Sequence, residues 1–131
     1  MPGIMVTPPV KITGFRAYTD LTTYQYCMVK YQAANVATVA SANTDLVFGV
    51  LYNEPYTGEP CEIVPPGQIC LMKVDGAAGA IVPGTRLASG SDGRGHSITT
   101  NVKRASAIAL DNSAADGDII AVALIPSDVS L

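Results

Sequence analysis

Short runs of apolar and β-branched residues alternate with turn-forming residues along most of the chain after residue 23. After Phe48, few windows as long as three helical turns lack Gly or Pro, so the pattern predicts strands rather than long helices. The predicted strands cover residues 24–31, 35–40, 46–51, 61–64, 68–74, 81–87, 105–110 and 119–125.

Two stretches allow further predictions: residues 32–42 have an alternative as a helix, and residues 65–67 predict a turn. The alanine-rich segment 32–42 also fits a short helix, because alanine has the highest helix propensity. The turn residues 65–67 (Pro-Pro-Gly) predict a hairpin that joins strands 61–64 and 68–74. In such a hairpin Cys61 would lie opposite Cys70, within reach of a disulfide in an oxidising compartment.

A chain of 131 residues with 12 Gly and 9 Pro in this arrangement predicts one all-β domain, either a small β-barrel or a sandwich. We expect residues 1–20 to form an extended N-terminal arm, because prolines favour extended backbone, and residues 21–131 to form the single β domain. A weak internal similarity indicates two β units. In each unit an apolar strand is followed by a turn with Gly and an acidic residue, Gly58-Glu59 or Gly117-Asp118, and by an aliphatic residue five positions after the glycine, Ile63 or Val122.

Composition narrows the function. Apolar residues make up 48% of the chain and charged residues 15%, with a net charge of -3. The eight Lys and Arg are scattered, so no basic surface for nucleic acid is expected. The first residues lack the features of a secretory signal, and no apolar run approaches the length of a bilayer span. We therefore expect folding in a cytoplasm, without a membrane partner.

Few residues suggest chemistry. The one histidine, His96, follows a glycine-rich loop, and the three cysteines lack metal-ligand spacing, so buried thiols, no metal site and no cofactor are expected. Met72-Lys73-Val74 is similar to the modified lysine motif of biotin carriers, but the expected Glu-Ala before it is Cys70-Leu71. We predict no enzymatic activity, and a carrier or small hydrolase is the third class considered.

The stretch 46–126 resembles the small capsid decoration, or cement, proteins of tailed bacteriophages. The resemblance rests on turn glycines and aliphatic strands: 48–51 with Gly58-Glu59, Ile63 with Gly67, 74–76, 80–87 with Asp92-Gly93, and 107–110 with Gly117-Asp118 and the last strand. It implies a β-barrel or β-tulip-like protein on the outside of the virion capsid, which binds the major capsid protein and cements neighbouring capsomers of the expanded head. It also implies a homo-oligomer, with a trimer favoured.

The N-terminal segment is the expected partner-binding part of the chain. It is either a disordered start or an apolar, proline-stiffened arm that docks on a neighbour with little loss of entropy. The candidate binding residues are Pro2, Ile4, Met5, Val6, Pro8, Pro9 and Val10. The alternatives to a decoration protein are another phage module, such as a tail or baseplate component, and a carbohydrate-binding domain that uses the tyrosines (18, 24, 26, 31, 52 and 56) as a platform.

Overall fold

A computed structural model describes residues 7–98 and 103–129 of the chain, without the side chains of residues 128 and 129. The described residues contain ten strands and no helix. The strands are β1 (Ile12–Ala17), β2 (Met28–Ala33), β3 (Val36–Val39), β4 (Val47–Leu51), β5 (Pro60–Val64), β6 (Ile69–Asp75), β7 (Arg86–Ser89), β8 (Gly95–Ser97), β9 (Arg104–Ala109) and β10 (Asp116–Val129). The all-β prediction is confirmed.

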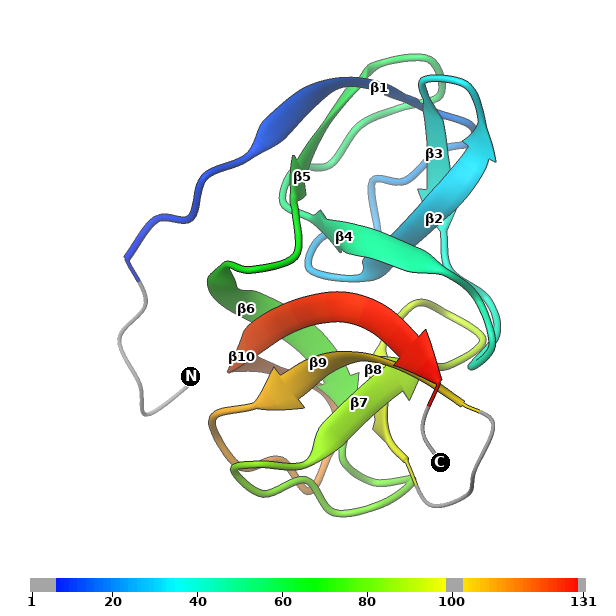
Figure 1. Ribbon diagram of the computed structural model, residues 1–131. Helices are drawn as coiled ribbons and strands as arrows, with labels where there is room; N and C mark the ends of the chain where they lie inside the picture. Colours follow the sequence, from blue (N-terminus) through cyan, green and yellow to red (C-terminus); the bar gives the residue numbers. More distant parts are fainter. Residues whose placement is uncertain (1–6, 99–102, 130–131) are drawn as a thin grey trace.

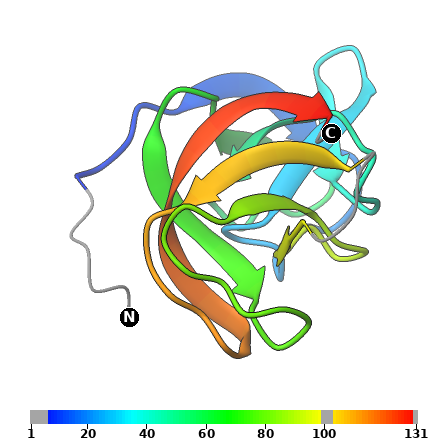
Figure 2. The ribbon, with the colours of Figure 1, turned by 60° about the horizontal axis from the view of Figure 1, so that its bottom comes forward.

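The strands close into two barrels, which lie one above the other in Figure 1. Barrel 1 has the strand order β1-β3-β2-β4-β5, and barrel 2 has the order β10-β6-β8-β7-β9. Figure 2 shows how the strands of barrel 2 curve around its interior. Closure pairs every edge strand, so neither sheet has a free edge within the barrel.

Several sequence expectations change with this topology. The helix considered for residues 32–42 is wrong, because these residues form the end of β2, a turn, β3 and the start of the loop after it. The hairpin around residues 65–67 is also wrong: β5 pairs with β1 and β4, whereas β6 pairs with β10 and β8. The Pro-Pro-Gly turn instead connects the barrels, and Cys61 and Cys70 lie in different barrels. Part of the range expected for the arm, 12–17, forms β1 of barrel 1.

The two barrels have the same topology. In each barrel the first and third strands are parallel, and all other neighbours are antiparallel. Strands β1 to β5 therefore correspond in order to β6 to β10. Matching the registers around both barrels gives equivalent residues: Phe15 and Met72, Arg16 and Lys73, Ala17 and Val74, Val29 and Leu87, Tyr31 and Ser89, Ala37 and Gly95, Gly49 and Ala107, Leu51 and Ala109, Ile63 and Val122.

Turns with left-handed backbone repeat at the same places. Tyr26 (φ 68°) lies three residues before Val29, and Gly84 (φ 93°) lies three residues before the equivalent Leu87. The amide of Tyr26 donates to the Leu51 carbonyl, and the amide of Gly84 donates to the Ala109 carbonyl. Two further pairs agree: Asn35 (φ 59°) with Gly93 (φ 77°), and Gly58 (φ 80°) with Gly117 (φ 89°). The chain therefore consists of two barrels with duplicated structure, as the sequence similarity around Gly58 and Gly117 indicated.

A single apolar cluster joins the barrels. The interior of barrel 1 forms its own cluster around Val29, Leu51 and Ile63. The interior of barrel 2 instead shares a cluster with residues on the outer face of barrel 1. Among them are Met28 and Val50, which alternate along their strands with residues of the barrel 1 interior. β4 lies against β10, and backbone bonds cross from Lys73 N to Tyr26 O, Met28 N to Gly93 O and Arg104 N to Asn43 O, each 2.8 Å. The barrels therefore fold onto each other as one unit.

Gly93 tests the importance of this contact. A Cβ added at Gly93 would press on Val39 Cγ2 and lie 3.1 Å from both Cys27 Cβ and Met28 O of barrel 1, and the residue also has positive φ. We expect Gly93→Ala to lower the free energy of unfolding by about 3 kcal/mol or more, from backbone strain and displaced barrels. Gly58→Ala is the matched control: its φ is similar, but nothing lies within 4 Å, so only about 1–2 kcal/mol of strain is expected. Equal losses in urea titrations of the two variants would contradict the role of Gly93 at the junction.

Candidate partner-binding surface

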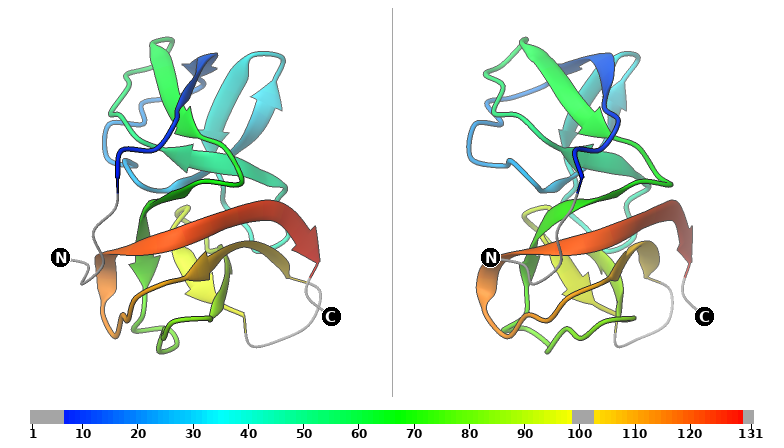
Figure 3. Two further views of the ribbon diagram at one scale, coloured as in Figure 1. Left: turned by 60° about the vertical axis from the view of Figure 1, so that its left-hand side comes forward. Right: turned by 90° about the vertical axis from the view of Figure 1, so that its left-hand side faces the viewer.

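The described end of the N-terminal segment lies on the body of the protein. Val10 donates its amide to Gln68 Oε1 at 3.3 Å, and Lys11 Nζ lies 3.4 Å from Glu62 Oε1. Lys11 also stands 5.7 Å from the centre of the Tyr52 ring. The segment therefore runs along one side of the molecule beside the connection between β5 and β6, as Figure 3 shows in dark blue.

A shallow hollow of about 210 Å³ lies between this segment and the junction of the barrels. It is lined by Thr7, Pro8, Pro9, Lys11, Tyr52 and Leu71. Three of the predicted binding residues, Pro8, Pro9 and Val10, thus lie beside the junction, and Val10 is 65% exposed. The other four predicted residues, Pro2, Ile4, Met5 and Val6, lie outside the described residues.

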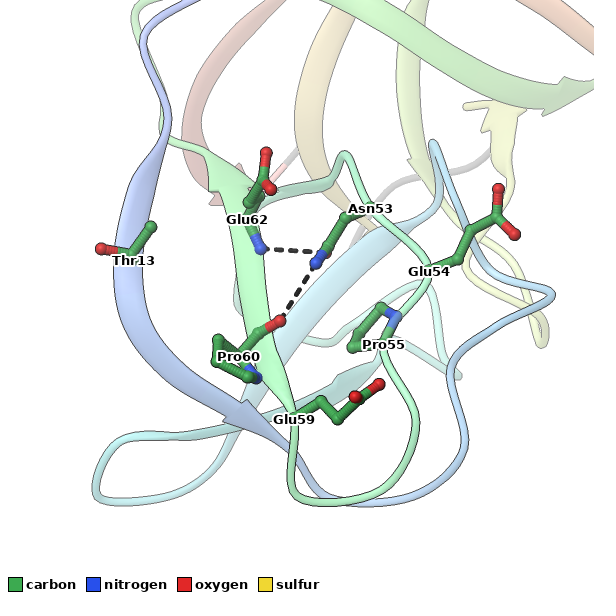
Figure 4. A pocket seen from close by; sticks show the side chains of 7 residues that line it. All are labelled: Thr13, Asn53, Glu54, Pro55, Glu59, Pro60 and Glu62. Atoms are coloured by element: carbon green, nitrogen blue, oxygen red, sulfur yellow. Dashed lines mark hydrogen bonds between the residues drawn. The ribbon is translucent and has the colours of Figure 1, made fainter.

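A second hollow, of about 340 Å³, lies on barrel 1 between β1 and the loop before β5 (Figure 4). Asn53 fixes its floor: its Nδ2 donates to the Pro60 carbonyl at 3.0 Å, and its Oδ1 accepts the Glu62 amide at 2.9 Å. The carboxylates of Glu54, Glu59 and Glu62 line the hollow but point in separate directions. No group of three His, Cys, Asp or Glu side chains in the described part of the chain could hold a metal ion. Sequence analysis missed this hollow, because Thr13 of β1 comes to lie beside residues 53–62 only when barrel 1 closes.

Other residues considered for chemistry lie apart from these hollows. His96, in β8, has its Nδ1 4.0 Å from Asp75 Oδ2. Lys73 lies within β6, paired with Ile119, and not at the tip of a hairpin. The described residues include no helix with the length and apolarity of a bilayer span.

The tyrosines do not form one platform. Tyr26 and Tyr52 pack edge to face, with ring centres 5.1 Å apart, whereas Tyr18 and Tyr56 are exposed. Tyr31 stacks on Phe48 with ring centres 4.0 Å apart and an angle of 14°. Phe15 completes this aromatic cluster, 5.6 Å from Tyr31 and 4.9 Å from Phe48. Residues far apart in the sequence thus form one partly exposed aromatic surface on barrel 1.

Comparisons with known proteins show a likeness to solved structures. No family model matches the chain, and no curated protein matches it. The crystal structure of the head fiber gp8.5 N base of bacteriophage phi29 is similar, with a TM-score of 0.65 over 93% of this chain and 98% of that chain. Sequence identity is 16%, so this likeness shows the fold alone.

The three cysteines are free thiols buried in the protein, as expected from the sequence. Burial raises the pKa of Cys27 to about 11 and that of Cys70 to about 12, so neither forms a thiolate near neutral pH. We expect the native protein to react with Ellman's reagent at a small fraction of the rate of the urea-unfolded protein. Dithiothreitol should leave the melting temperature unchanged. Rapid labelling of native Cys27, located by mass spectrometry, would contradict this arrangement.

Tyr52 links the barrels through its hydroxyl, which accepts the Leu71 amide at 2.7 Å. We expect Tyr52→Phe to cost about 1–2 kcal/mol at neutral pH, because the Leu71 amide loses its partner. Burial raises the pKa of Tyr52 to about 12. Because burial disfavours the charged phenolate, the neutral Tyr52 contributes a stability that is present below the ordinary pKa near 10 and is lost as the pH rises through 12. The gap in stability between wild type and variant should therefore narrow above pH 10 in urea titrations; a constant gap up to pH 12 would contradict the assignment.

Proposed function

We propose that the protein is a structural component of a bacteriophage virion that binds the exterior of the head and cements neighbouring capsomers. The observation that carries the proposal is the two-barrel fold, which it shares with a phage head fiber base along nearly the whole length of both chains. The proposed partner is the major capsid protein, and the proposed role is passive attachment, without catalysis.

The position of the N-terminal segment supports attachment through the arm. Pro8 and Pro9 stiffen the segment, and its contacts with the barrels leave Val10 exposed beside the junction. An extended segment that is already held at one end loses less conformational entropy when the remainder docks on a shell protein. Several such arms on one particle would add their weak contacts through avidity.

Binding to isolated heads tests this function. We expect the purified protein to co-sediment with expanded heads that lack it, taken from the phage that encodes it, and to raise the temperature at which those heads release DNA. A variant without residues 1–10 should bind at least about tenfold more weakly, since it loses the arm contacts. Circular dichroism provides the control that its β fold is intact.

The outcomes separate the parts of the proposal. Absence of co-sedimentation at micromolar protein would refute attachment to the head. Binding without a change in the release temperature would refute cementing alone, and equal binding of the truncated variant would refute the role of the arm. Selective binding to a glycan array, without head binding, would favour a carbohydrate-binding domain instead.

A further inference from the structure

The contact between the barrels is head-to-tail. Barrel 2 contributes Lys73, Gly93 and Arg104, which we call its head surface, and barrel 1 contributes Tyr26, Met28 and Asn43, which we call its tail surface. The equivalents of Lys73 and Gly93 in barrel 1 are Arg16 and Asn35, which make their backbone bonds within barrel 1. The two barrels therefore meet through different surfaces, and each chain keeps one unused head and one unused tail. An interface of this type can repeat between copies.

The unused head lies on barrel 1 and is more exposed than its counterpart. Tyr31 is 55% exposed, whereas the equivalent Ser89 in barrel 2 is 2% exposed. Leu46, which the chain places three residues before Gly49, is also 55% exposed, and the equivalent Arg104 is half-buried. The aromatic cluster of Phe15, Tyr31 and Phe48 lies on this head. An exposed apolar surface of this kind is typical of an interaction site.

The unused tail lies at the opposite end of the molecule, on barrel 2. Its backbone includes Gly84, equivalent to Tyr26, in the turn that leads into β7. Arg86 is exposed where the equivalent Met28 is fully buried against barrel 2. The guanidinium of Arg86 has no ion pair with any residue that the structure describes.

The side chains of these two free surfaces are complementary. Superposition of the contact between the barrels onto two chains puts Arg86 in the place of Met28 and Phe15 in the place of Met72, and these two methionines belong to one buried cluster. An arginine over aromatic rings is stabilised by cation–π attraction. The same superposition brings Leu110, equivalent to Tyr52, to a hollow of about 270 Å³ lined by Thr13, Gly14, Phe15, Arg16 and Pro60. Tyr52 meets Leu71 in the same way within one chain.

One backbone bond would not repeat. The amide of Lys73 crosses to barrel 1, whereas the amide of Arg16 already donates to the Asn35 carbonyl at 2.9 Å. The contact between chains therefore depends more on side chains than the contact within a chain, and single substitutions at exposed positions should disrupt it.

We propose that a second copy of this chain binds through the free surfaces, with Arg86 of its barrel 2 placed over the aromatic cluster of Phe15, Tyr31 and Phe48 on barrel 1. The contact repeats between chains the arrangement that joins the barrels within each chain. It requires no capsid, so its failure and the failure of head attachment are separate results.

Complementation between two variants tests the proposal. The head variant carries Tyr31→Ser and Leu46→Ser, with serine at position 31 as at the equivalent Ser89; the tail variant carries Arg86→Glu. We expect the wild type to form oligomers at micromolar to millimolar concentration in sedimentation velocity. Each variant alone should associate with an affinity that is lower by at least about tenfold. An equimolar mixture of the two variants should form a dimer and nothing larger, because one intact head meets one intact tail.

Controls use exposed residues that belong to neither named surface. Tyr18→Ser removes a tyrosine that is 53% exposed, and Lys11→Glu makes the same charge change as Arg86→Glu; both should associate like the wild type. Thermal melts establish that the variants fold. A wild type that stays monomeric at millimolar concentration would overturn the proposal. Oligomers that survive in both variants, or a mixture that forms no dimer, would overturn it as well.

Discussion

The structure depends on the burial of one outward face of barrel 1 against barrel 2. Met28, Val50 and Val64 alternate with residues of the barrel 1 interior, yet all three are fully buried because barrel 2 covers them. Burial of each such side chain contributes about 2 kcal/mol. A five-stranded barrel of half this chain would be only marginally stable alone, because a domain of about 60 residues buries only about 60% of the surface that its unfolded chain exposes. The shared cluster makes the two barrels one folding unit, and the backbone bonds at Lys73, Gly93 and Arg104 fix their relative position.

This asymmetric contact explains why equivalent positions carry different residues. At the covered head of barrel 2, Ser89 and Ser106 are buried and satisfied by hydrogen bonds to Gly90 O and Ser127 Oγ. At the open head of barrel 1 the corresponding positions hold Tyr31 and Phe48. Aromatic rings close the end of the barrel that no second barrel covers within the chain. The two barrels have the same fold but different sequences, and these differences in residue type follow from whether a second barrel covers the position.

Much of the strand pattern could be predicted from the sequence, because short apolar runs between turn residues are a local signal. Strands β4, β5, β6 and β9 lie within a residue or two of their predicted positions. Pairing is not local: the Pro-Pro-Gly turn before Gln68 has hairpin chemistry, but each flanking strand finds both neighbours elsewhere. The head surface could not be predicted for the same reason, since Phe15, Tyr31 and Phe48 meet only once the barrel closes. The prolines of the N-terminal segment predicted extended backbone there. Strand β1 was not predicted, because Gly14 interrupts its apolar pattern; in the structure a bulge between Ile12 and Phe15 accommodates this glycine.

The proposed attachment and the proposed self-association use different parts of the molecule. The described end of the arm lies along the side of the two-barrel unit, held by Gln68 and Glu62 (Figure 3). The free head and tail lie at the two ends, because the duplicated barrels are stacked one above the other. Copies joined end to end would therefore all present their arms without covering them. Repetition of the arm along one assembly multiplies contacts that are individually weak, and mechanical reinforcement of a shell requires many such contacts rather than one strong site.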